Sequence, residues 1–174
     1  ICLIVIAFFS VNATISWGDC ENDKGTIVKK EISLSKFDKI HLNGSSTVYL
    51  TTGKLQKVVI ETTQNIIDIL KTDVNNGEWH IGFEKCINVK NGVKIYVDIE
   101  SINKLSVNGS GDIIGKNTIE SEKLDLNVKG SGDMNLSVST QKINAKIQGS
   151  GDIKISGKAS TQNVVIQGSG DYTA

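Results

Sequence analysis

The chain has 174 residues, of which 39% are hydrophobic and only 5% aromatic, so Val, Ile and Leu supply most of the apolar side chains. Proline and arginine are absent, and 19 lysines balance 19 acidic residues to a formal net charge of zero. This length suits one domain with a real core or a short run of repeats. The charge balance argues against nucleic-acid binding, because neutralising several phosphates needs a basic surplus on one face.

The chain starts with an unbroken apolar run over residues 1–9, and Val11-Asn12-Ala13 follows where a signal peptidase would cut. The run is too short to span a bilayer, which takes about 20 residues. We therefore predict that residues 1–13 are part of a signal peptide whose charged start is missing, and that residues 14–25 are a linker. A buried strand is the alternative interpretation of the apolar run.

Export would leave Cys20 and Cys86 as an even pair of cysteines in an oxidising compartment. A disulfide between them is one interpretation. Two free thiols are the other, because a sequence does not show whether two Cα atoms come within bridging range. His41 and His80 have no zinc-ligand spacing to these cysteines, so each is interpreted as a solvated strand residue. No metal or cofactor is predicted from them.

The first half of the chain contains short strand patterns. Residues 39–50 alternate apolar and polar side chains through a turn at Gly44-Ser45-Ser46-Thr47. Residues 75–77 (NNG) predict a tight turn, and residues 65–71 predict a single helical turn. Further strands are predicted at 57–62, 78–83 and 93–99.

The second half repeats one four-residue word, Gly-Ser-Gly-Asp, whose copies start at Gly109, Gly130, Gly149 and Gly168. The copies are 21, 19 and 19 residues apart. Apolar and polar residues alternate on both sides of each copy without a change of parity, which is typical of a strand with one buried face. Each unit is therefore predicted to be strand, corner, strand, with the motif glycines facing inward where a corner leaves no room for a side chain. These corner glycines are Gly109, Gly111, Gly130, Gly132, Gly149, Gly151, Gly168 and Gly170.

A period of about 20 residues is too short for a βαβ unit and suits one coil of a β-solenoid. We predict an all-β fold, a right-handed parallel β-helix with coils of about 19–21 residues and irregular N-terminal strands. It would occupy residues 26–174 as a single domain, with the repeats at 103–174. An antiparallel sandwich or barrel is the alternative. Only three residues follow the last copy, so we expect the natural protein to continue beyond Ala174.

The order of these features resembles the family of autotransporter-adhesin head GIN domains, a bacterial family of unknown function. The resemblance covers about residues 26–174 and rests on the strand at 36–40 (KFDKI), the turn and strand at 76–81 (NGEWHI) and the repeated Gly-Ser-Gly-Asp corners. It implies an exported β-helical protein in the periplasm or at the cell surface of a Gram-negative bacterium. The chain departs from the family pattern at Ser46 and Thr47 and lacks closing coils, which leaves a C-terminal cap undefined.

The repeated aspartates are the one candidate metal site. If the coils stack in register, these carboxylates recur about every 5 Å along one ridge, and Ca²⁺ would relieve their repulsion. Hydrogen bonds from Asp to corner amides explain the same residues without a metal. The calcium candidates are Asp112, Asp133, Asp152 and Asp171.

No copy of the repeat carries a distinguishing base or a second carboxylate that would form a catalytic pair. We therefore predict a non-catalytic, adhesin-like binding or scaffold protein with no cofactor and no transmembrane segment once the signal is removed. Its partner would be a surface glycan or a protein, met by outward polar rows such as Asn108, Lys129, Gln148 and Gln167. A glycan-active β-helix enzyme and a calcium-stabilised surface repeat protein are the alternatives.

Overall fold

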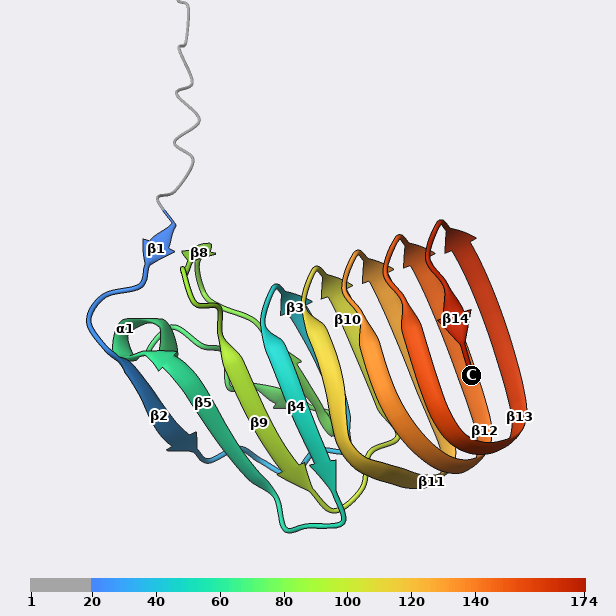
Figure 1. Ribbon diagram of the computed structural model, residues 1–174. Coiled ribbons are helices and arrows are strands. Elements are labelled where there is room, and N and C mark those ends of the chain that lie inside the picture. The colour runs from blue at the N-terminus through green and yellow to red at the C-terminus, as the bar shows by residue number, and fades with distance from the viewer. Residues whose placement is uncertain (1–19) are drawn as a thin grey trace, which may run out of the picture.

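The computed structural model describes residues 20–174, so the predicted signal peptide and the first half of the predicted linker, residues 14–19, lie outside the described residues. The fold is all-β, as predicted, and the described residues contain one helical turn, α1 (Gln64–Ile67). Twelve strands form one mixed sheet that curls along the molecule, and β1 (Glu21–Asn22) pairs separately with β8 (Ile87–Asn88) (Figure 1). Among residues 20–174 there is no helix long and apolar enough to cross a membrane.

The repeat half consists of parallel strands stacked in register with the sequence repeat. Each long strand leaves one Gly-Ser-Gly-Asp corner, follows a rounded bend and returns to the next corner (Figure 1). The residues of the bend are polar, but they stay in the ladder, as the pairs Ser121↔Thr140 and Lys123↔Lys142 show. The strands are β10 (Lys104–Gly109), β11 (Asp112–Gly130), β12 (Met134–Gly149), β13 (Ile153–Gly168) and β14 (Tyr172–Thr173).

One column of aliphatic side chains runs through the interior of the stacked coils. Val107 pairs with Val128, Val128 with Ile147, and Ile147 with Ile166, which confirms the predicted inward parity. The first three are buried, whereas Ile166 is 44% exposed in the last coil. The core is therefore a stack of equivalent residues, and its C-terminal end is open in this structure.

The N-terminal half supplies the first coil, but its strands do not stack in the order of the sequence. The strands β3 and β4 pair with β10 and β11 on one side, and with β7 and β9 on the other. Two antiparallel pairs, β2 with β5 and β5 with β9, extend this sheet, so it is mixed rather than wholly parallel as predicted. The strands are β2 (Ile27–Ile32), β3 (Lys39–Gly44), β4 (Thr47–Thr52), β5 (Lys57–Thr63), β6 (Val74–Asn75), β7 (Glu78–Ile81) and β9 (Lys94–Ile99).

The predicted tight turn is confirmed by the antiparallel pair of β6 with β7. Its two loop residues, Asn76 and Gly77, have φ of 51° and 73°. Positive φ at both positions is what a two-residue type I′ hairpin requires, and Asn-Gly is the sequence that accepts it most readily. This hairpin starts β7, which lies beside β3.

The two glycines of each corner meet different constraints. Gly109 has a φ of +129°, and a Cβ added there would lie 2.6 Å from the carbonyl oxygen of Gly44 in the preceding coil. Gly111 has no such φ, but its added Cβ would lie 2.5 Å from the carbonyl oxygen of Ser46. Real Cβ atoms do not approach backbone so closely, so the second glycine is required by the distance between coils rather than by its own conformation.

Candidate functional site

The aspartate column carries hydrogen bonds from coil to coil. Each carboxylate accepts the backbone N–H of the aspartate in the next coil, Asp112 from Asp133 at 3.1 Å and Asp133 from Asp152 at 2.8 Å. Asp152 accepts in the same way from Asp171 at 2.9 Å. Asp112, Asp133 and Asp152 thus each cap the following corner. Calcium binding at this column stays a prediction, and no cluster of three metal-ligating side chains occurs within residues 20–174.

The predicted outward polar rows are flat ladders of side chains. Asn108, Lys129, Gln148 and Gln167 are in register, and the Gln148 amide donates to Gln167 at 2.9 Å. A second row joins Asn163 to Asn144 at 3.0 Å and Asn144 to Asp125 at 2.7 Å. These amides bond mainly to one another along the solenoid, so the rows stabilise the stack as well as presenting a polar surface.

A charged cluster that the sequence did not predict surrounds Glu61 on β5. The Tyr96 hydroxyl donates to its carboxylate at 2.8 Å, and the ammonium groups of Lys29 and Lys94 lie 3.1 and 3.2 Å from it. The Tyr96 hydrogen bond first, and then that of Lys29, lower the pKa of Glu61 from 4.5 to about 2. The four residues come from β2, β5 and β9, which pair antiparallel. No local sequence pattern indicates that these three strands are neighbours.

Two tyrosines stack beside this cluster. The rings of Tyr49 and Tyr96 lie 5.1 Å apart and nearly parallel. Lys29 covers the Tyr96 ring at 5.2 Å from its centroid, and Lys116 covers the Tyr49 ring at 4.4 Å. Because lysines and the partner ring contact these faces, the pair is a cation–π stack that stabilises the sheet rather than an open platform for a ligand.

His41 and His80 form a second stacked pair, on the outer face of β3 and β7. They are in register, and their ring centroids lie 5.2 Å apart. Burial, and then the neighbouring His80, lower the pKa of His41. The sequence interpretation of two separate solvated histidines missed this contact, because nothing local shows that β3 and β7 are neighbours.

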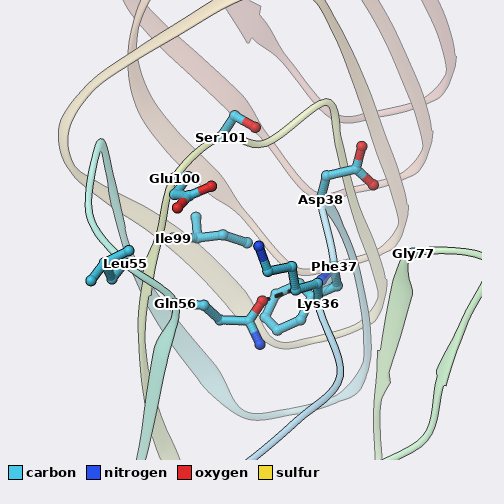
Figure 2. A pocket seen from close by; sticks show the side chains of 9 residues that line it. All are labelled: Lys36, Phe37, Asp38, Leu55, Gln56, Gly77, Ile99, Glu100 and Ser101. Carbon is cyan, nitrogen blue, oxygen red and sulfur yellow. Dashed lines mark hydrogen bonds between the residues drawn. The ribbon is translucent and has the colours of Figure 1, made fainter.

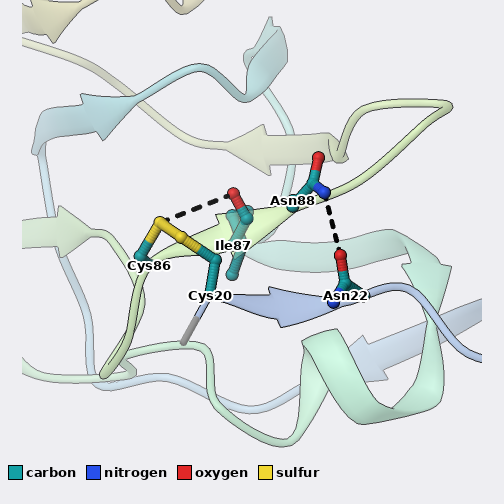
Figure 3. Close-up of a disulfide and its surroundings, with 5 residues drawn as sticks. All are labelled: Cys20, Asn22, Cys86, Ile87 and Asn88. Carbon is teal, nitrogen blue, oxygen red and sulfur yellow. Dashed lines mark hydrogen bonds between the residues drawn. A yellow bond between two sulfur atoms is a disulfide. The ribbon is translucent and has the colours of Figure 1, made fainter. Parts of the chain in front are cut away.

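A disulfide joins Cys20 to Cys86, with a sulfur–sulfur distance of 2.07 Å and Cα atoms 4.5 Å apart (Figure 3). It lies at the start of the short pair β1–β8. The Asn88 side chain donates to that of Asn22 at 2.8 Å across this pair. The bridge therefore fixes the N-terminal segment to the loop that leads from β7 to β9.

A pocket of about 480 Å³ opens near the start of β3 (Figure 2). Gln56 holds one wall in place, because its side chain accepts the Phe37 N–H at 3.2 Å and donates to the carbonyls of Leu34 and Ser35 at 3.1 Å. Leu55 is 80% exposed at the edge of this pocket. The lining residues are Lys36, Phe37, Asp38, Leu55, Gln56, Gly77, Ile99, Glu100 and Ser101.

The lining combines an apolar patch with several hydrogen-bonding groups. Leu55 offers exposed apolar surface, whereas Ile99 is only 2% exposed. Figure 2 shows Asp38 on the opposite side of the pocket from Leu55 and Glu100. The volume falls in the range of small-ligand sites, and so does this mixture of groups. The sequence did not predict the pocket, since its residues come from four separate connections.

Comparison with known proteins identifies the family. Residues 36–174 match the family described as "Putative auto-transporter adhesin, head GIN domain". No curated protein matches the chain.

Several solved structures share the fold at low identity. A protein from Parabacteroides distasonis named a putative lipid binding protein has a TM-score of 0.71 and 20% identity, over 90% of this chain and 76% of that one. A putative adhesin from the same species has a TM-score of 0.66 and 23% identity over the same shares. A putative adhesin from Parabacteroides merdae has a TM-score of 0.57 and 13% identity, over 90% of this chain and all of that one.

Proposed function

Because the chain belongs to the family of autotransporter-adhesin head GIN domains, we propose that it is a non-catalytic, adhesin-like binding module of the bacterial cell envelope. The observation that carries this proposal is the exposed Leu55 beside a pocket of about 480 Å³. A single exposed leucine is common on protein surfaces, but one at the edge of a hollow of small-ligand size suggests a contact surface. We call this the Leu55 pocket.

The lining of the Leu55 pocket favours a saccharide as the ligand. A sugar ring has an apolar C–H face and a rim of hydroxyl groups. Leu55 can contact the first, while Asp38, Glu100 and Ser101 can bind the second. The proposed partner is therefore a surface glycan, presented where the chain makes its connections between β4 and β5 and between β9 and β10.

The repeated carboxylates support a role without catalysis. Asp112 and Asp133 are each engaged by an amide of the next coil, and the copies resemble one another instead of forming a distinct pair. Asp38 accepts a hydrogen bond from Asn103 at 2.7 Å. Asp38 and Glu100 nevertheless share one pocket, and paired carboxylates are what glycoside hydrolysis uses. An experiment must therefore separate binding from cleavage.

The proposal includes the location and the architecture of the protein. The Cys20–Cys86 disulfide supports an exported protein in the periplasm or at the surface of a Gram-negative cell, because such bonds persist in oxidising compartments. The in-register parallel coils support a β-helix, for which we propose the right-handed winding usual for parallel crossovers. We propose that its single domain spans residues 26–174 and follows the 14–25 linker.

The test is an array of bacterial surface glycans probed with the purified protein, together with an assay for released reducing ends. We expect binding to some glycans without release of reducing ends, and a loss of affinity of about tenfold or more in Leu55→Asp. Ile27→Asp is the matched control, because Ile27 is also an exposed aliphatic residue, at 47%, but lies outside the pocket.

Three results would contradict the proposal. Absence of binding to every glycan would reject the ligand class. Equal losses of glycan affinity in Leu55→Asp and Ile27→Asp would reject the site. Release of reducing ends that is abolished in Asp38→Asn, in Glu100→Gln or in the double variant Asp133→Ala/Asp152→Ala would identify a glycan-active enzyme instead.

A further inference from the structure

The corners that start at Gly130, Gly149 and Gly168 share a pattern of backbone hydrogen bonds that reaches one coil back. At the corner that starts at Gly109, only the Ser110 N–H donates to the Gly44 carbonyl, at 3.0 Å. The N–H groups of Ser131 and Gly132 both donate to the carbonyl of Gly109, at 2.9 and 3.0 Å. The N–H groups of Ser150 and Gly151 donate to the carbonyl of Gly130 in the same way, at 2.8 and 3.1 Å. At each such corner, one oxygen of the preceding coil satisfies two consecutive amides.

The first corner lacks this oxygen. Strand β7 pairs with β3 only as far as Leu42↔Ile81, after which the chain leaves the ladder through residues 82–93. Within residues 20–174 no hydrogen-bond acceptor is found for the N–H groups of Ser45 and Ser46. The Ser46 hydroxyl, in a residue only 2% exposed, also has no partner among the described residues. Three donors of one corner are therefore unsatisfied, which is costly unless a ligand or solvent binds them.

A pocket of about 560 Å³ lies beside this corner, where the chain leaves the ladder after β7. Among its lining residues the titratable side chains are Lys71, His80 and Lys85, and none of the lining residues is acidic. Two acids lie close to this lining: Glu78, 3.7 Å from His80 and paired with Lys104 at 3.0 Å, and Glu84, which stands between Phe83 and Lys85 in the sequence. We call this the first-corner pocket, and its lining residues are Asn43, Gly44, Ser45, Lys71, His80, Gly82, Phe83, Lys85, Cys86 and Ile87.

The walls of the first-corner pocket are held by contacts on both sides. The Lys71 N–H donates to the Gly82 carbonyl at 2.9 Å, which fixes the backbone of Lys71 against the pocket. Cys86 is bound to Cys20 through the disulfide (Figure 3). Gly44 is the last residue of β3 and Gly82 follows the end of β7, whereas the Leu55 pocket lies where these strands begin, so the two pockets are separate.

We propose that the first-corner pocket is an oxyanion-binding site that takes a sulfate, phosphate or carboxylate group. One ligand oxygen would accept from the N–H of Ser45, which lines the pocket, and from the adjacent N–H of Ser46. A glycine carbonyl of the preceding coil does the same at the corners that start at Gly130, Gly149 and Gly168. Lys71 and Lys85 would neutralise the charge, as ammonium groups do in phosphate and carboxylate sites. The group can come from a free ion or from an acidic sugar, and the proposal stands independently of the Leu55 pocket.

Amide NMR of the ¹⁵N-labelled protein tests the proposal directly. Sodium sulfate, sodium phosphate and galacturonate are titrated separately, with sodium chloride at matched ionic strength as the reference. We expect saturable shifts of the Ser45 and Ser46 amide signals and none at Ser131, whose N–H already has an acceptor. If galacturonate binds about tenfold more tightly than the inorganic ions, the source is an acidic sugar, and if it does not, the source is a free ion.

Charge variants complete the test. Lys71→Gln/Lys85→Gln is expected to weaken binding by about tenfold or more, whereas Lys129→Gln, a change on the outer polar row, should leave it unchanged. Unshifted Ser45 and Ser46 signals, or equal affinity in the double lysine variant, would overturn the proposal. Neither result would affect glycan binding at the Leu55 pocket, which the Leu55→Asp variant reports.

Discussion

The two halves of the molecule use the same strand-and-corner unit in different ways. In the repeat half, β10 to β14, every corner, inner column and outer row recurs from coil to coil. In the N-terminal half, the first coil is separated from its neighbours in sequence by β5, α1 and β6, and both described pockets lie there. A regular repeat presents the same groups at every level, so a unique site arises where the regularity is interrupted.

The contrast between the halves is tested most strongly at the corner glycines. Gly130→Ala is expected to destabilise the protein by about 4 kcal/mol, because its Cβ would overlap the Gly109 carbonyl and its φ is +119°. Gly44→Ala should cost only about 1–2 kcal/mol for its positive φ, since nothing lies within 4 Å of the added Cβ. Urea unfolding of both variants measures the difference, and equal losses would show that the close approach of coils does not decide the choice of glycine.

The disulfide tests how far the irregular half depends on a covalent link. Replacing Cys20 and Cys86 together by Ser is expected to cost about 3 kcal/mol, because the bridge closes a loop with a sequence separation of 66. Reducing agent should lower the stability of the wild type by a similar amount and leave the double variant unchanged. A thermal melt that does not respond to reduction would mean that the first half is held together by its sheet alone.

The aspartate column tests whether the repeat half needs its coil-to-coil caps. Asp133→Ala is expected to cost about 1–1.5 kcal/mol, because it leaves the Asp152 N–H without its charged acceptor. Asp171→Ala is the matched control, since no described residue donates to its carboxylate, and it should be close to neutral. If calcium acts here instead, a chelator would lower the melting temperature of the wild type by more than that of Asp133→Ala.

The smallest expected effect is the pH dependence of the Glu61 cluster. The folded pKa of about 2 lies below the ordinary value of 4.5, so the stabilisation is complete above pH 4.5 and is lost as the pH falls toward 2. The full shift corresponds to roughly 3 kcal/mol, and solvent screening reduces it to about 1 kcal/mol. Unfolding at pH 6 and pH 3 should show this loss in the wild type and not in Glu61→Gln. Glu31→Gln, at an exposed pair with Lys57, should keep the wild-type dependence.

The sequence predicted those features that depend on alternation within a short segment. The inward position of Val107 and Val128 and the turn at Asn76-Gly77 follow from parity and turn chemistry, and the structure confirms both. The rounded bends were missed because the polar residues near Ser121 look like a loop, although ladder bonds to Thr140 keep them in the strand.

The candidate sites could not be predicted because they depend on which strands become neighbours. Strands β7 and β9 pair with the sides of β3 and β4 that face away from β10 and β11. This placement is what brings His41 to His80 and Glu61 to Tyr96. The unsatisfied amides of Ser45 and Ser46 are a further example. The departure from the family pattern at Ser46 and Thr47 marked this corner as unusual. Only the structure shows that the segment beside it, after β7, has left the ladder.

The placement of the first coil between two later segments also has a kinetic consequence. Asn108 bonds to Asn43 across a separation of 65 residues, whereas the aspartate bonds within the repeat span 19 or 21. Closing the longer loop costs more entropy, and contacts of high sequence separation slow folding. The assembly of β3 and β4 between their partners is therefore expected to be the slow nucleation step. Later coils would add rapidly, each on the finished edge of the one before.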